Sequence, residues 1–224
     1  MGFSRERRRL LAWAAAGLVA GPARAAWARR VFPQAETTEF LALRHGEVIG
    51  LRRQEIGREG GDLVVRNEEE LSVGPDAQPI YRYVQRCEEV WRTGWLQALV
   101  SDTEEDGRQW RVRAERIDGI FSGVSNGRRF TVSGYAITNT FWHRDAHSQQ
   151  GLLDVTDGWV KLIQGQLIGE EKVTVGNERR DSKHYLIHGQ INRHLWYDLD
   201  CRLVRLQAPL RDGTEVHYEV PEGV

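Results

Sequence analysis

Short runs of alternating apolar and polar residues dominate most of the chain. In the stretch 110–115, Trp110, Val112 and Ala114 fall on one side, and the charged residues between them fall on the other. Strict alternation predicts a β-strand with one buried and one solvated face. Beyond the first residues, no segment shows a sustained helical period with caps at its ends. The pattern therefore predicts an all-β domain.

Turn signals separate these runs. Five of the turn signals are Asp-Gly or Asn-Gly pairs, which accept the positive φ that tight hairpin turns require. They lie at residues 106–107, 118–119, 126–127, 157–158 and 212–213. Successive hairpins predict an antiparallel sheet in which neighbours in sequence are also neighbours in space.

Two stretches suggest an internal repeat. "LRHGEVIG" at 43–50 resembles "LIQGQLIG" at 162–169, and Trp91 and Trp196 hold corresponding places before a turn. We interpret these as two related β-meanders joined by the irregular stretch 134–151. The alternative is chance similarity between strands rich in turns. Two meanders that share a core predict an antiparallel barrel or half-barrel.

The first residues are typical of an export signal. A basic start precedes an apolar run at 10–20, and small residues occupy the positions that a signal peptidase needs, before a cut after Ala25. The run is shorter than the ~20 residues of a permanent membrane span. We predict a signal peptide over 1–25, with cleavage after Ala28 as the alternative, and a single domain over 26–224.

The route of export can also be predicted. Twin arginines followed by two leucines resemble the twin-arginine signal, which exports folded proteins; an ordinary secretory signal is the alternative. The expected location is the periplasm or another exported compartment. No cysteine stands at the leader end for lipidation, so we expect no permanent membrane anchor.

Composition narrows the range of partners. Apolar residues make up 40% of the chain and charged residues 28%, as in ordinary globular proteins. Without its arginine-rich leader the chain is mildly acidic, and its basic residues are interspersed with acidic ones. Nucleic acid is therefore not an expected partner.

Export would bring the two cysteines, Cys87 and Cys201, into an oxidising compartment. They could form one disulfide that closes a long loop, or they could be two unrelated buried thiols. No C-x-x-C motif is present, so a thioredoxin-type role has no support.

Three stretches resemble catalytic or metal sites. The motif His143-x-Asp145-x-His147 offers ligands that suit zinc and is the basis of a metal-dependent alternative. Residues 123–127 match G-x-S-x-G, but Asn126-Gly127 predicts a hairpin turn where a nucleophile elbow needs a helix. The stretch "HLWYDLDCRLVRLQ" at 194–207 is interpreted as a strand, a turn capped by an aspartate, and a second strand.

Tryptophan is frequent, with eight residues. Its ordinary role is packing in a core or at its rim. The functional hypothesis is an apolar pocket inside the barrel, with Trp91, Trp110 and Trp196 as the predicted ligand-binding residues.

Several longer stretches carry a family resemblance: "YRYVQRCEEVWRTGWL", "DGWVKLIQGQLIGEEKV" and the "LWYD" turn followed by a leucine-rich strand. Over about residues 36–220 the chain resembles a family of exported bacterial proteins catalogued only as a domain of unknown function. The family's turn usually has glycine where this chain has Cys201. The resemblance implies an antiparallel barrel or half-barrel, similar to envelope carriers that hold lipid on a concave apolar face. It implies no catalytic residues.

The sequence hypothesis is thus an exported, non-enzymatic binding or carrier domain for a lipid or another apolar small molecule, with no cofactor. The alternative is a metal-dependent enzyme that uses His143, Asp145 and His147.

Overall fold

The computed structural model describes residues 36–75 and 79–222. The predicted signal peptide lies outside these residues. The described chain forms fourteen β-strands and one short 3-10 helix, η1, over Arg144–Ser148. No helix in this part of the chain is long and apolar enough to cross a membrane.

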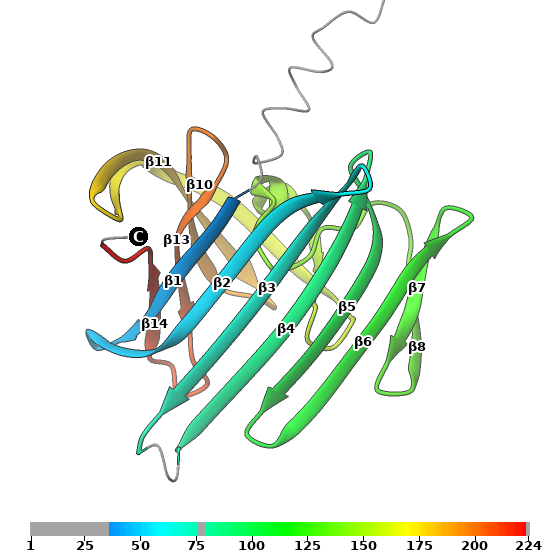
Figure 1. Cartoon of the computed structure of the whole chain (residues 1–224), viewed down its shortest axis with the longest axis horizontal. Coiled ribbons are helices and arrows are strands. Elements are labelled where there is room, and N and C mark those ends of the chain that lie inside the picture. The colour runs from blue at the N-terminus through cyan, green and yellow to red at the C-terminus, as the bar shows by residue number, and fades with distance from the viewer. Residues whose placement is uncertain (1–35, 76–78, 223–224) are drawn as a thin grey trace, which may run out of the picture.

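The strands form a single sheet that curves around a concave face (Figure 1). In chain order they are β1 (Glu36–Arg44), β2 (Glu47–Glu59), β3 (Asp62–Val73), β4 (Tyr81–Arg92), β5 (Trp95–Glu105), β6 (Arg108–Ile117), β7 (Ile120–Ser125), β8 (Arg128–Val132), β9 (Gly151–Leu153), β10 (Val160–Val175), β11 (Glu178–Gly189), β12 (Arg193–Asp198), β13 (Leu203–Pro209) and β14 (Glu215–Glu219).

The sheet consists of two antiparallel meanders. Strands β1 to β8 follow one another across one half, and β9 to β14 follow one another across the other half. The halves join where β1 pairs with β14, with Leu41 opposite Glu219. Strands β8 and β9 are the two ends of the sheet, so it stays open. The prediction of an all-β half-barrel built from two meanders is confirmed.

The hairpin turns lie where the sequence predicts them. Asp106, Asp118 and Asn126 have φ values of 50°, 50° and 45°, and the glycine after each also has positive φ. These pairs join β5 to β6, β6 to β7 and β7 to β8. Asn126-Gly127 is therefore a hairpin turn, and Ser125 is a strand residue rather than a nucleophile on an elbow.

The equivalence proposed for the two repeat stretches is wrong. Residues 43–50 include the turn between β1 and β2, where His45 and Gly46 have positive φ. Residues 162–169 lie entirely within the long strand β10. The first glycine of the motif therefore serves a turn at Gly46 and a strand at Gly165, because glycine suits both a reversal and a close approach of backbones, whereas the Ile-Gly pair lies in a strand in both stretches.

The concave face is filled by the connection between the two meanders. This inner segment, residues 133–159, contains η1 and extends through β9, the edge strand of the second meander. Its apolar side chains belong to the same buried cluster as those of the sheet; they include Ile137, Phe141, Trp142, Leu152 and Leu153. The sequence predicted an irregular connection over 134–151 but not that it would be the centre of the core.

One glycine allows the inner segment to lie close to β10. A Cβ at Gly165 would come within 1.9 Å of the carbonyl oxygen of His147 in η1. Only glycine lets the two backbones approach this closely. This close approach explains why β10 carries a glycine in its interior.

Candidate functional site

The three tryptophans predicted to bind a ligand lie in different places. Trp91 is in the main core and is 1% exposed, whereas Trp196 lies in a second, small cluster with Val173 and Val204. Trp110 is half-buried on β6, opposite Thr103. The structure does not bring the three together, so a shared binding role stays a prediction without geometric support.

Trp91 contributes to a buried polar cluster that attaches the inner segment to the sheet. The carboxylate of Glu89 on β4, 0% exposed, accepts four hydrogen bonds. The indole N–H groups of Trp91 and Trp142 donate to Oε2 at 2.8 and 2.9 Å. The hydroxyls of Thr138 and Thr140 donate to Oε1 at 2.8 and 2.6 Å.

Burial raises the pKa of Glu89, and these four hydrogen bonds act in the opposite direction because they stabilise the charged form. Buried carboxylates without such partners are costly. Neither of the two surface hollows described below includes Glu89 in its lining. We therefore assign this cluster to the folding of the inner segment rather than to ligand binding.

The predicted metal motif lies in η1 rather than on a strand. His143 caps the helix, and its Nδ1 accepts a hydrogen bond from the backbone N–H of Asp145 at 3.2 Å. The ring of His147 stacks on Tyr185, and its Nδ1 is 2.7 Å from the carbonyl oxygen of Arg144. Among the described residues, no group of three or more His, Cys, Asp or Glu side chains could hold a metal ion. The geometry gives the metal-dependent alternative no support.

The two cysteines lie in separate elements and are not joined by a disulfide in the described structure. Cys87 is buried in β4, where burial raises the pKa of its thiol. Cys201 lies in the turn between β12 and β13 with a φ of 67°. The disulfide between them therefore stays a prediction.

The turn interpretation of residues 194–207 is confirmed. Strand β12 ends at Asp198 and β13 begins at Leu203. The Oδ1 atom of Asp198 accepts hydrogen bonds from the backbone N–H groups of Asp200 and Arg202 at 3.0 and 2.9 Å. This is the capping role expected of a turn aspartate.

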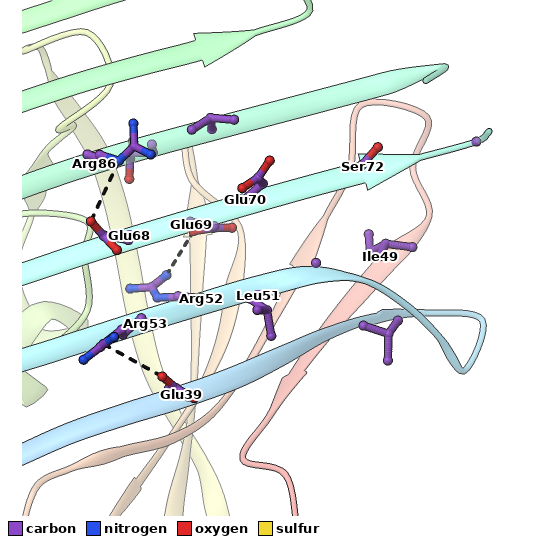
Figure 2. Close-up of a pocket in the computed structure, with 15 residues that line it drawn as sticks. Glu39, Ile49, Leu51, Arg52, Arg53, Glu68, Glu69, Glu70, Ser72 and Arg86 are labelled. Carbon is purple, nitrogen blue, oxygen red and sulfur yellow. Dashed lines mark ion pairs between the residues drawn. The ribbon is translucent and has the colours of Figure 1, made fainter. Parts of the chain in front are cut away.

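Two of the hollows in the described surface have volumes that could hold a small molecule. The first, an outer groove of about 610 Å³, crosses β1 to β4 and is shown in Figure 2. Its charged side chains face one another: Arg53 lies 3.9 Å from Glu39, and Arg86 lies 3.8 Å from Glu68. The groove is open and is formed by one meander alone, which is typical of a twisted outer face.

The second hollow lies on the concave side, at the end of the half-barrel where β5 turns into β6 and β13 leads to β14 (the lower end in Figure 1). This funnel has a volume of about 380 Å³. Both meanders and the inner segment contribute to its wall. Its polar lining residues are Arg52, Glu69, Tyr81, Tyr83, Gln85, Glu105, Asn139, Thr140, Asp154, Thr156, Gln190, Asn192, Arg193, Arg211 and Tyr218.

Arg52 and Glu69 are part of the funnel's polar lining, and both residues also line the outer groove. The guanidinium of Arg52 donates to the carbonyl oxygen of Thr140 and lies 3.6 Å from the carboxylate of Glu69, a pair also marked in Figure 2. The hydroxyl of Tyr218 donates to Glu69 at 2.6 Å. Arg52 is 6% exposed, so the protein has placed a cation almost fully out of water at this point.

A second ion pair closes the rim of the funnel and joins the two meanders. Arg211, between β13 and β14, donates to Glu105 of β5 at 2.6 Å. Tyr81 donates to the same carboxylate at 3.2 Å. Because this lining is mainly charged and hydroxylated, the funnel favours a polar ligand rather than the apolar ligand expected from the sequence.

Sequence reasoning missed the residues of the funnel. They come from seven strands and four connections, and each polar side chain alone resembles an ordinary surface residue. One signal was present: Arg52, Gln54 and Asn67 are polar residues at strand positions that point inward. The sequence alone does not give the register of the sheet, so it could not show that these side chains point inward.

Comparison with known proteins agrees with this fold. A crystal structure described as a beta-barrel-like protein of domain of unknown function DUF1849, from Brucella abortus, superposes with a TM-score of 0.62 at 11% identity. The match covers 86% of this chain and 98% of that chain. No curated protein matches the sequence. The family model described as Domain of unknown function (DUF6134) matches residues 40–220, and the chain therefore belongs to that family.

Proposed function

We propose that this protein is a non-enzymatic binding or carrier domain whose funnel holds a small polar molecule. The observation that supports this most is the nearly buried Arg52 in the wall of a concave cavity built by both meanders and the inner segment. Binding sites of small molecules are concave and carry a few fixed polar groups. The signal-like residues 1–25 support a further proposal, that binding takes place outside the cytoplasm.

The lining favours recognition over acid–base chemistry. Each carboxylate of the funnel is already engaged: Glu69 by Tyr218, Glu105 by Arg211, and Asp154 by the side-chain amide of Asn139 at 3.0 Å. A general base needs a carboxylate that can reach the substrate's proton. Engaged carboxylates instead hold the lining in one arrangement, which lowers the entropic cost of binding.

Native mass spectrometry of the full chain, purified from its natural source without denaturation, tests the proposal. We expect an additional small-molecule mass at near-equal stoichiometry. Thr156→Trp places an indole in the funnel and should abolish that mass, whereas Thr131→Trp makes the same change on the exposed part of β8 and should retain it. The proposal would be overturned if the wild-type protein carried no bound molecule, or if the bound molecule were still present in Thr156→Trp.

A further inference from the structure

The turn between β11 and β12 gives one side of the funnel a surplus of hydrogen-bond donors. Gln190 and Asn192 both line the funnel, and the side-chain oxygen of each is already in use. Oε1 of Gln190 accepts the backbone N–H of Leu162 at 2.7 Å, and Oδ1 of Asn192 accepts that of Gly189 at 3.3 Å. Because a backbone N–H only donates, these bonds fix the amide orientations and leave both NH₂ groups as donors.

Arg193, the next residue, adds a charge to these donors. It lines the funnel and donates to the carbonyl oxygen of Asn192 at 2.7 Å. Among the described residues, no Asp or Glu side chain forms an ion pair with it. The other cations do have acidic partners: Arg52 has Glu69, and Arg211 has Glu105.

The third carboxylate of the funnel, that of Asp154, lies 3.9 Å from the ammonium of Lys161, which also pairs with Asp157; neither Lys161 nor Asp157 lines the funnel. Arg193 is therefore the one cation of the described funnel lining that forms no ion pair with a carboxylate. A guanidinium of this kind beside two amide donors is suited to a group with one negative charge and several acceptor lone pairs.

From this arrangement, and resting on the proposed binding function, we propose that the funnel's ligand is a carboxylic acid whose carboxylate contacts Arg193 and the amide groups of Gln190 and Asn192. The planar guanidinium matches a carboxylate in two parallel hydrogen bonds. The hydroxyls and amides elsewhere in the funnel would then contact an uncharged polar remainder of the ligand.

An NMR titration of the folded chain tests this with three small probes at constant ionic strength: acetate, its neutral analogue acetamide, and inorganic phosphate. We expect saturable shifts of the backbone amides of residues 189–193 with acetate and none with acetamide. Arg193→Gln should weaken acetate binding about tenfold, because the glutamine amide can keep one of the two parallel hydrogen bonds but loses the other together with the charge. Arg86→Gln, on the exposed outer face, is the matched control and should leave it unchanged.

Asn192→Asp provides an independent variant, because it keeps the oxygen that accepts from Gly189 and replaces the donor by a negative charge. It should also weaken acetate binding. The carboxylate proposal is overturned if acetamide binds equally well, if phosphate binds more tightly than acetate, if no saturable shift occurs, or if neither variant weakens binding. A neutral molecule that native mass spectrometry finds on the wild type and not on Thr156→Trp would overturn this proposal and leave the binding function standing.

Discussion

Replacement of Glu89 with alanine removes the carboxylate that attaches the inner segment to the sheet. Two buried indole N–H groups, those of Trp91 and Trp142, would lose their acceptor. The two threonine hydroxyls lie 2.8 Å apart and can still bond to each other. A buried donor left without a partner costs about 1–3 kcal/mol, so we expect Glu89→Ala to lower the free energy of unfolding by about 4 kcal/mol.

Glu89→Gln is the matched control because it keeps the shape. Its amide oxygen can accept both indole N–H groups, while its NH₂ group donates to the hydroxyls of Thr138 and Thr140. We expect a loss of about 1 kcal/mol, since only the charge-assisted part of the bonds disappears. Urea unfolding followed by tryptophan fluorescence and circular dichroism gives both values. If Glu89→Ala is as stable as the wild type, or if Glu89→Gln is as damaging as Glu89→Ala, the four-donor account is refuted.

Three further predictions concern stability. Burial lowers the pKa of His143 to about 4, below its usual 6.5. As the pH falls, the imidazole therefore takes up a proton in the unfolded chain before it does so in the folded protein. Between pH 6.5 and 4 the free energy of unfolding should drop by about 3 kcal/mol more in the wild type than in His143→Asn. Urea unfolding at several pH values measures this, and equal slopes would contradict it. Gly165→Ala should lower the free energy of unfolding by about 2 kcal/mol, measured by thermal unfolding, because its Cβ would clash with His147. A Cβ at Gly169 would meet nothing within 4 Å, so Gly169→Ala should lower it far less. Similar losses in the two variants would contradict the close approach. Asp198→Ala should lower the free energy of unfolding by about 1 kcal/mol, and Asp198→Asn should lower it much less, because asparagine keeps the oxygen that caps the turn. Denaturant unfolding measures both values, and equal losses would exclude the capping role.

Local chemistry made the elements of this fold predictable. Asp-Gly and Asn-Gly pairs mark positive-φ turns such as Asp106-Gly107, and alternation over 110–115 marks a strand with Val112 inward. These signals depend only on neighbours in the chain, so they can be recognised in the sequence without knowledge of the fold. They were sufficient for an antiparallel half-barrel of two meanders.

Contacts between distant residues were not predictable in the same way. Glu89 meets Trp142 across 53 positions, and Arg211 meets Glu105 across 106 positions. No periodicity links such pairs, because they meet only when the meanders curve and the inner segment enters the concave face. Trp91 shows the consequence: the sequence allowed core or pocket, and its burial in the main cluster and its bond to Glu89 assign it to the core.

A crystal structure of the full chain, isolated from its natural source with its bound molecules retained, would test the central claim most directly. The account predicts a small molecule in the funnel between the two meanders, with an acidic group within hydrogen-bond distance of Arg193. The claim would be contradicted if the molecule were bound in the outer groove. It would also be contradicted if the funnel held only solvent while the protein retained a ligand elsewhere.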